Sequence, residues 1–168
     1  MSILIKPVKL TSRAIKDLIK LKSFNSNLYG GARTQEIIDE IKDCLPQVEV
    51  VYHGYLSHRE AVGLMRKAHL LLNFIFKGAS SQMISGKLLE YLATGIPVLS
   101  VGDPRSVAGE FISQGSAAVM LDAKDTKEIS AFISKLAFEK GRVFNLFPGL
   151  EQWSREGLTQ QLIETLAP

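Results

Sequence analysis

Hydrophobic and polar positions along the chain follow two alternating periods, which predict alternating strands and helices. Apolar or β-branched runs of strand length occur at 48–53 (VEVVYH), 69–76 (HLLLNFIF), 97–101 (PVLSV) and 117–121 (AAVML), with a shorter candidate at 27–29. Runs without polar alternation are typical of strands that are buried on both faces of a parallel sheet. Apolar residues recur at helical spacing over 11–23, 34–45, 58–67, 85–94, 104–114, 125–140 and 148–166.

This order of elements predicts an α/β fold, a Rossmann-like doubly wound parallel sheet of about five to six strands with helices on both faces. We expect one domain over 1–168, in which 1–25 is a basic N-terminal segment. Local signals agree with the helices. Ser57 and Glu60 form a capping box, and Gly95 closes the helix over 85–94. Pro104 is expected to open a helix, and Asp125 to cap the one that follows.

Ligands of such sheets bind at the carboxyl ends of the strands. The loops after Tyr29, His53, Phe76 and Val101 are therefore the candidate site. Glycines stand in or near each of these loops, where they let a ligand approach the backbone.

Composition narrows the class of protein. The chain has 168 residues and one cysteine, Cys44, so neither an internal disulfide nor a cysteine metal cluster can form. The longest apolar run is far shorter than the roughly 20 residues of a membrane span. The N-terminus lacks the features of a signal peptide. A cytoplasmic location is the simplest expectation.

The net charge of +3 is unevenly distributed. Residues 1–22 carry a net +5 and the rest of the chain −2, so a nucleic-acid surface over the whole domain is not expected. The segment over 11–23 is expected to be an ordinary surface helix whose lysines extend toward water. The alternative is peripheral contact with an anionic membrane surface.

Several familiar motifs are absent. The sequence has no G-x-G-x-x-G fingerprint, no P-loop around Gly86-Lys87 and no D-x-D for a divalent ion on a nucleotide sugar. The histidines His53, His58 and His69 lack a zinc spacing, and His53 is expected to be structural. We therefore expect no metal site and no bound cofactor.

The segment 78–97 (GASSQMISGKLLEYLATGIP) is the most informative part of the chain. A helix there begins in a stretch of small residues at Ser85-Gly86, so its free N–H groups can bind an anion. Lys87 adds a positive charge, and Glu90 is a bidentate acceptor that suits two vicinal ribose hydroxyls. The alternative is a solvated helix face with an i,i+3 Lys–Glu pair. A helical wheel divides this helix into two faces. The polar face carries Lys87, Glu90, Tyr91 and Thr94. The opposite face, expected to lie toward the sheet, carries Leu88, Leu89, Leu92 and Ala93.

At this point the sequence resembles the donor-binding, C-terminal half of the group 1 retaining glycosyltransferases of the GT-B fold, over about 28–168. The elements that carry the resemblance are GYLSHRE at 54–60, AHLLLNF at 68–74, KLLEYLATGIPVL at 87–99 and WSREGLTQQL at 153–162. The resemblance implies sugar transfer from a nucleotide-diphosphate sugar with retention, in the synthesis of a cell-surface polysaccharide or glycoconjugate. It also implies that no tightly bound metal is needed.

The resemblance assigns roles to individual residues. It implies that Glu90 holds the ribose, that Lys87 and the helix start at Ser85-Gly86 hold the diphosphate, and that the loop 54–56 (Gly54, Tyr55 and Leu56) lies by the base. Gln82 stands where many members have a glutamate that contacts the donor sugar. Arg13 and Lys16 are similar to a basic pair that clamps the diphosphate, and Arg33 is a second candidate for that contact.

The resemblance covers only one half of a two-domain enzyme. We therefore expect the nucleotide-sugar donor as a partner, together with an N-terminal acceptor domain or a partner subunit that completes the cleft. Activity is not expected from this half alone. Two alternatives remain open, a non-catalytic Rossmann-like binding or regulatory module and half of a nucleotide-sugar epimerase.

Overall fold

The computed structural model describes residues 2–5, 25–28, 39, 50–53, 55–75, 83–139 and 144–166. Most of the helices expected over 11–23 and 34–45 lie outside these residues. The strands are β1 (Ser2–Ile5), β2 (Asn25–Leu28), β3 (Val50–Tyr52), β4 (Leu70–Phe74), β5 (Val98–Val101) and β6 (Ala118–Leu121). The helices are α3 (His58–Lys67), α4 (Gly86–Ala93), α5 (Val107–Ile112), α6 (Thr126–Phe138), the 3-10 turn η1 (Leu150–Trp153) and α7 (Arg155–Leu166).

The six strands form one parallel sheet in the order β3-β2-β1-β4-β5-β6, which confirms the doubly wound fold. The strand β1 was not predicted, although it lies at the centre of the sheet. Ile3 pairs with Ser26 of β2 on one side and with Leu70 of β4 on the other. One of the two central strands of the sheet is therefore formed by a segment of only four residues, SILI, which is too short to give a clear strand pattern in the sequence.

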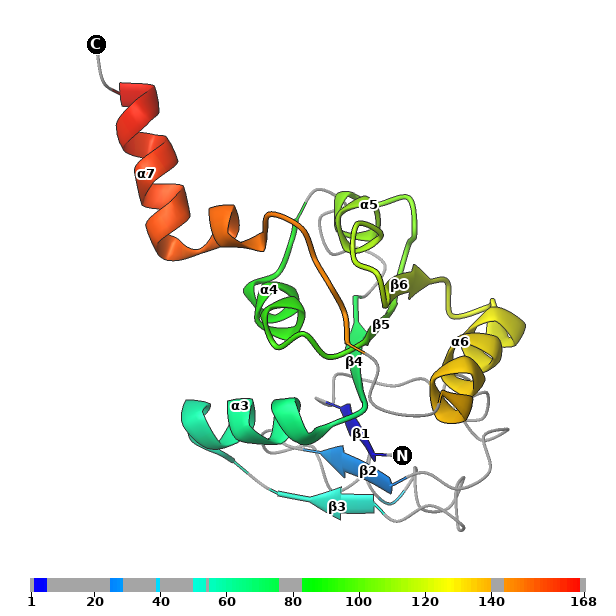
Figure 1. The fold of residues 1–168 in the computed structure, drawn as a ribbon. Helices are drawn as coiled ribbons and strands as arrows, with labels where there is room; N and C mark the ends of the chain where they lie inside the picture. The colour runs from blue at the N-terminus through cyan, green and yellow to red at the C-terminus, as the bar shows by residue number, and fades with distance from the viewer. Residues whose placement is uncertain are drawn as a thin grey trace.

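Helices cover both faces of the sheet (Figure 1). On one face, Leu71, Val98 and Met120 pack with the buried residues of α3, α4 and α5. Side chains alternate along a strand, so Leu70, Leu72 and Leu99 point to the other face, where α6 lies. The buried residues of α6, Ile129 and Ile133, are the part of that helix that belongs to the core.

Two expected helix boundaries are wrong. Ser106, not Pro104, caps α5, because its hydroxyl accepts from Gly109 N at 3.1 Å while Pro104 lies in the preceding turn. The start of α6 is as expected, with Asp125 at the N-cap position, although its side chain makes no capping hydrogen bond. The last expected helix is broken at Ser154 into η1 and α7. The helix α7 has no buried residue and projects from the body of the protein (Figure 1).

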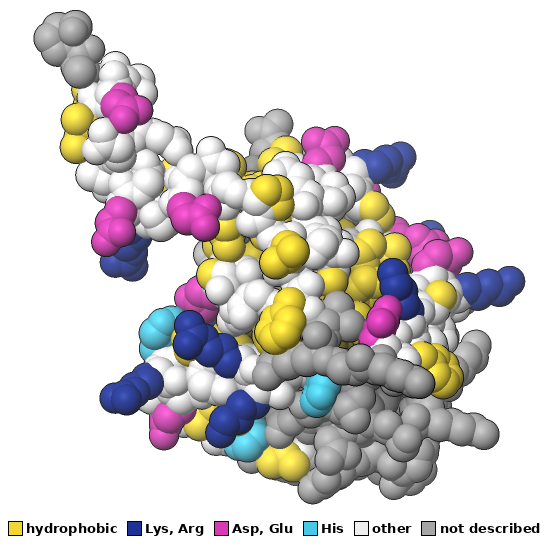
Figure 2. Space-filling model, viewed as in Figure 1, with side chains coloured by type: hydrophobic (Ala, Val, Ile, Leu, Met, Phe, Trp, Pro, Cys, Tyr) yellow, Lys and Arg dark blue, Asp and Glu magenta, His cyan; other side chains and the backbone are white. Residues whose placement is uncertain are grey.

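The expected capping box of α3 is present. Ser57 Oγ accepts from Glu60 N at 3.4 Å, and the Glu60 carboxylate accepts from Ser57 N at 2.9 Å and from Ser57 Oγ at 2.6 Å. At the other end of α3, Arg66 and Lys67 complement the negative end of the helix dipole. Side chains of Lys, Arg and His gather over α3 on the face shown in Figure 2.

The capping box makes the stability of the N-terminus of α3 depend on pH. Hydrogen bonds from the side chain and then the backbone of Ser57 lower the pKa of Glu60 from its ordinary value of 4.5. A lowered pKa contributes stability above 4.5 that is lost as the pH falls through the lowered value. We expect Glu60→Gln to unfold at a lower temperature than wild type at pH 7, with the difference shrinking below pH 4.5. Thermal unfolding followed by circular dichroism at several pH values tests this, and a constant difference would contradict it.

Candidate functional site

The sheet topology locates the candidate site. The strand order reverses between β1 and β4, the two strands at the centre of the sheet. In open parallel sheets, ligands bind at the carboxyl ends of the strands beside this reversal. Ile5 ends β1 and Phe74 ends β4, and α4 is the helix that follows β4. The sequence pattern predicted a site at this edge of the sheet. Because it did not predict β1, it could not identify the point where the strand order reverses.

The start of α4 is arranged for an anion. Ser85 is the N-cap, and its hydroxyl accepts from Leu88 N at 3.2 Å. The first N–H groups of a helix have no acceptor within it, so they carry partial positive charge. At Gly86 a Cβ would meet no heavy atom within 4 Å, which leaves the backbone open to close approach. Among the described helices, α3, α5, α6 and α7 each have an acid in the first turn, whereas α4 has none.

Lys87 and Glu90 form the i,i+3 ion pair that the alternative interpretation of this helix predicted. Lys87 Nζ lies 3.1 Å from Glu90 Oε2, and the side chains are 23% and 44% exposed. The same ammonium lies 5.2 Å from the centroid of the Tyr91 ring, a distance typical of a cation–π contact. Two opposite charges thus stand beside the open N-terminus of α4, within reach of one ligand.

The predicted faces of α4 need correction at two positions. Tyr91 was placed on the polar face with Lys87 and Glu90, yet it is fully buried, and Ala93 was placed toward the sheet, yet it is exposed. The cluster that buries Tyr91 includes Met65 of α3, so α4 is covered on its flank as well as by the sheet. A wheel drawn for a helix on a flat sheet cannot include this neighbour.

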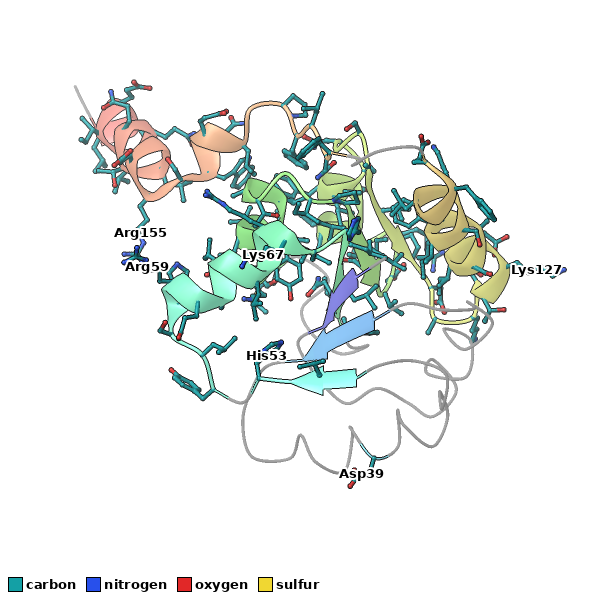
Figure 3. All side chains as sticks on the ribbon, turned by 60° about the horizontal axis from the view of Figure 1, so that its bottom comes forward. Asp39, His53, Arg59, Lys67, Lys127 and Arg155 are labelled. Atoms are coloured by element: carbon teal, nitrogen blue, oxygen red, sulfur yellow. The ribbon has the colours of Figure 1, made fainter. Side chains whose placement is uncertain are left out.

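Other predicted site residues are placed less completely. Tyr55 is 91% exposed, and Leu56 packs against the core before α3 begins. His53 directly follows β3 and is partly buried, at the same edge of the sheet (Figure 3). The remaining predicted residues, Gly54, Gln82, Arg13, Lys16 and Arg33, lie outside the described residues.

Two polar features at this edge were not predicted. Asn73 Nδ2 donates to the fully buried Ser100 Oγ at 3.0 Å, and the two residues are directly paired between β4 and β5. Each residue interrupts an otherwise apolar run, which was the signal available in the sequence. After β5, Asp103 Oδ1 accepts from Arg105 N at 3.0 Å and lies 3.6 Å from its Nε. Both pairs add hydrogen-bonding groups near the strand ends.

An open cavity of about 360 Å³ lies elsewhere, at the opposite end of α4. It is lined by Leu92, Ala93, Gly95 and the segment 145–148, with Leu150 and Glu151. The last turn of α4 precedes β5, so this cavity lies toward the amino ends of the strands. It is therefore separate from the candidate site.

In the part of the chain that the structure describes, no three residues of His, Cys, Asp and Glu gather as a metal site would require. None of the described helices combines the length and apolar character that crossing a bilayer requires.

The comparisons with known proteins support the fold. No family model matches the sequence, and no curated protein matches it. Among solved structures, the chain is similar to AviGT4, a glycosyltransferase involved in avilamycin A biosynthesis, with a TM-score of 0.61, 16% identity and coverage of 98% of this chain and 50% of that one. It is also similar to the catalytic domain of cholesterol-alpha-glucosyltransferase from Helicobacter pylori, with a TM-score of 0.56, 16% identity and coverage of 97% and 95%.

A third similar structure is a family 9 glycosyl transferase from Veillonella parvula, with a TM-score of 0.50, 16% identity and coverage of 99% and 46%. The chain therefore has a Rossmann-like, glycosyltransferase-like fold. It spans about half the length of AviGT4 and of the family 9 enzyme.

Proposed function

We propose that the chain is the C-terminal, donor-binding domain of a retaining glycosyltransferase that uses a nucleotide-diphosphate sugar. One observation carries this proposal. The only two charged side chains of α4, Lys87 and Glu90, lie 3.1 Å apart at the start of that helix. The helix follows β4, beside the point where strand order reverses.

Each group of the proposed site matches one part of the donor. The diphosphate lies at the N-terminus of α4, with Lys87 as its counter-charge. The Glu90 carboxylate accepts hydrogen bonds from the two ribose hydroxyls. When the bond between the anomeric carbon and the diphosphate breaks, negative charge grows on the leaving oxygen. The helix dipole and Lys87 then stabilise that charge without reorganising.

The remaining residues complete the proposal. The base lies by Gly54, Tyr55 and Leu56, and Gln82 donates to a hydroxyl of the sugar. Basic residues before the site, Arg13, Lys16 and Arg33, contact the phosphates. The acceptor and the other wall of the cleft belong to an N-terminal domain or a partner subunit. The product is a cell-surface polysaccharide or glycoconjugate.

Calorimetric or NMR titration of the chain with UDP, GDP and ADP tests the proposal. We expect one of the three to bind saturably, with a dissociation constant of ~1 mM, because the titrated chain supplies only the proposed donor side of the cleft. Glu90→Ala is expected to weaken that binding at least about tenfold, since it removes two hydrogen bonds to a charged acceptor. The exposed Glu128 of α6 provides the matched control, and Glu128→Ala should bind as wild type does.

Two results would contradict the proposal. If none of the three nucleotides binds at millimolar concentration, the chain is not a donor domain that functions at this site. If one binds equally well to Glu90→Ala, with the fold intact by circular dichroism, the ribose is held elsewhere. The second result would favour the alternative in which Lys87 and Glu90 are only a surface pair.

A further inference from the structure

The ion pair on α4 has a consequence for ligand selection. Lys87 and Glu90 are the two charged side chains that bind the ligand in the proposed function. In the structure they form an ion pair with each other, with Nζ and Oε2 3.1 Å apart. Resting on that proposed function, we propose that this pair makes the site reject phosphate-bearing anions that lack a ribose, such as inorganic pyrophosphate. Glu90 is then a specificity-determining residue as well as a binding one.

The argument begins with what a bare anion does to the pair. An anion that takes the Lys87 ammonium separates it from Glu90. The carboxylate is 44% exposed, so it is only partly solvated when it loses its partner. It also remains within one helical turn of the new negative charge and repels it. At neutral pH pyrophosphate keeps a P–OH group, but it lacks the two vicinal hydroxyls with which a ribose would satisfy both oxygens of Glu90 while its phosphates bind Lys87.

A nucleoside diphosphate compensates both charges. Its phosphates replace Glu90 at Lys87, and its two vicinal hydroxyls replace Lys87 at Glu90. The number of charged hydrogen bonds at the site is therefore maintained or raised. The ion pair consequently lowers the affinity for a bare phosphate anion but not the affinity for a nucleoside diphosphate. The selection comes from the charge of Glu90 that the bare anion leaves unsatisfied.

The surroundings of Lys87 hold its ammonium near Glu90, so a ligand phosphate must compete with Glu90 for it. Its ammonium lies 5.2 Å from the centre of the Tyr91 ring, and Tyr91 is fully buried, so the ring provides a fixed wall. Lys87 itself is 23% exposed, which limits the directions that the side chain can take. The ammonium thus stays near Glu90 unless a ligand displaces it.

The variant Glu90→Gln tests this inference, because it keeps the size of the side chain and removes its charge. Inorganic pyrophosphate and the nucleoside diphosphate that wild type binds are titrated in parallel by calorimetry. We expect Glu90→Gln to bind pyrophosphate about twofold to fivefold more tightly and the nucleoside diphosphate at least about threefold more weakly. The two affinities thus move in opposite directions. Glu128→Gln on α6 removes the same charge far from the site and should change neither affinity.

The outcomes separate the inference from the proposed function. If the nucleotide weakens and pyrophosphate binds no more tightly, the selectivity role of the pair is wrong and the donor proposal stands. If the nucleotide binding is unchanged in Glu90→Gln, both are wrong. If both ligands tighten equally, Glu90 acts only through overall charge, which also overturns the inference. Raising the salt concentration should shrink the gain for pyrophosphate, since repulsion between partly exposed charges is screened.

Discussion

Gly109→Ala is expected to destabilise the protein by about 3 kcal/mol, because α5 has no room for a side chain at this position. A Cβ on Gly109 would come within 2.6 Å of the carbonyl carbon and 2.9 Å of the Cα of Pro104, with its carbonyl oxygen closer still. These are backbone atoms of the turn between β5 and α5, so no side-chain rotation relieves the clash. The helix must move, although Phe111 and Ile112 hold it in the core.

Gly63→Ala is the matched control, since it makes the same change in the middle of another helix. A Cβ on Gly63 meets no heavy atom within 4 Å, and the residue is exposed on α3. Replacing a helical glycine with alanine in open space stabilises by about 0.5–1 kcal/mol. Urea unfolding of the two variants and wild type should therefore give midpoints on opposite sides of wild type. A wild-type midpoint for Gly109→Ala would show that the turn at Pro104 is not packed as described.

The parts of the fold that were predicted correctly depend on local signals. The runs LLLNF and VLSV carry apolar residues on both faces, which is what a strand between two layers of helices requires. The capping box at Ser57 and the left-handed glycine at Gly95, with φ of 69°, are likewise features of a few adjacent residues. Such signals hold wherever the surrounding structure does not override them.

The central strand could not be predicted from local signals. Four residues, SILI, are too few to distinguish a strand from an apolar terminus. They form a strand because β2 and β4 supply hydrogen bonds on both sides, and these partners are distant in sequence. The burial of Tyr91 has a similar origin, since the hydrophobic cluster that contains Tyr91 also includes residues distant in sequence, such as Met65 of α3.

The candidate site was predictable where its residues share one helix. Lys87 and Glu90 are three positions apart, so helical geometry alone brings them together. The Asn73–Ser100 hydrogen bond joins two strands and requires their register, which the sequence does not state. The Lys87–Glu90 pair could thus be predicted from the sequence, whereas the Asn73–Ser100 hydrogen bond could not.

Lys87→Ala is expected to weaken the binding of a nucleoside diphosphate by about 10-fold to 100-fold, which corresponds to one charge-assisted hydrogen bond to phosphate. The nucleoside without phosphates should lose less than about twofold, because its ribose contacts Glu90 and not Lys87. The loss therefore grows with the number of phosphates. Calorimetry or NMR titration with the nucleoside, its monophosphate and its diphosphate measures this trend.

The control for this experiment is Lys127→Ala, which removes an exposed lysine from α6 (Figure 3). It lowers the net charge equally, so it should leave the whole ligand series unchanged unless binding responds to overall charge alone. Glu90→Ala should give a different pattern from Lys87→Ala, since it weakens every ligand that has a ribose, with or without phosphates. If Lys87→Ala weakens the nucleoside and the diphosphate equally, Lys87 supports the site only by holding Glu90 in place. The diphosphate must then be held by other groups, and the N-terminus of α4 loses its proposed role.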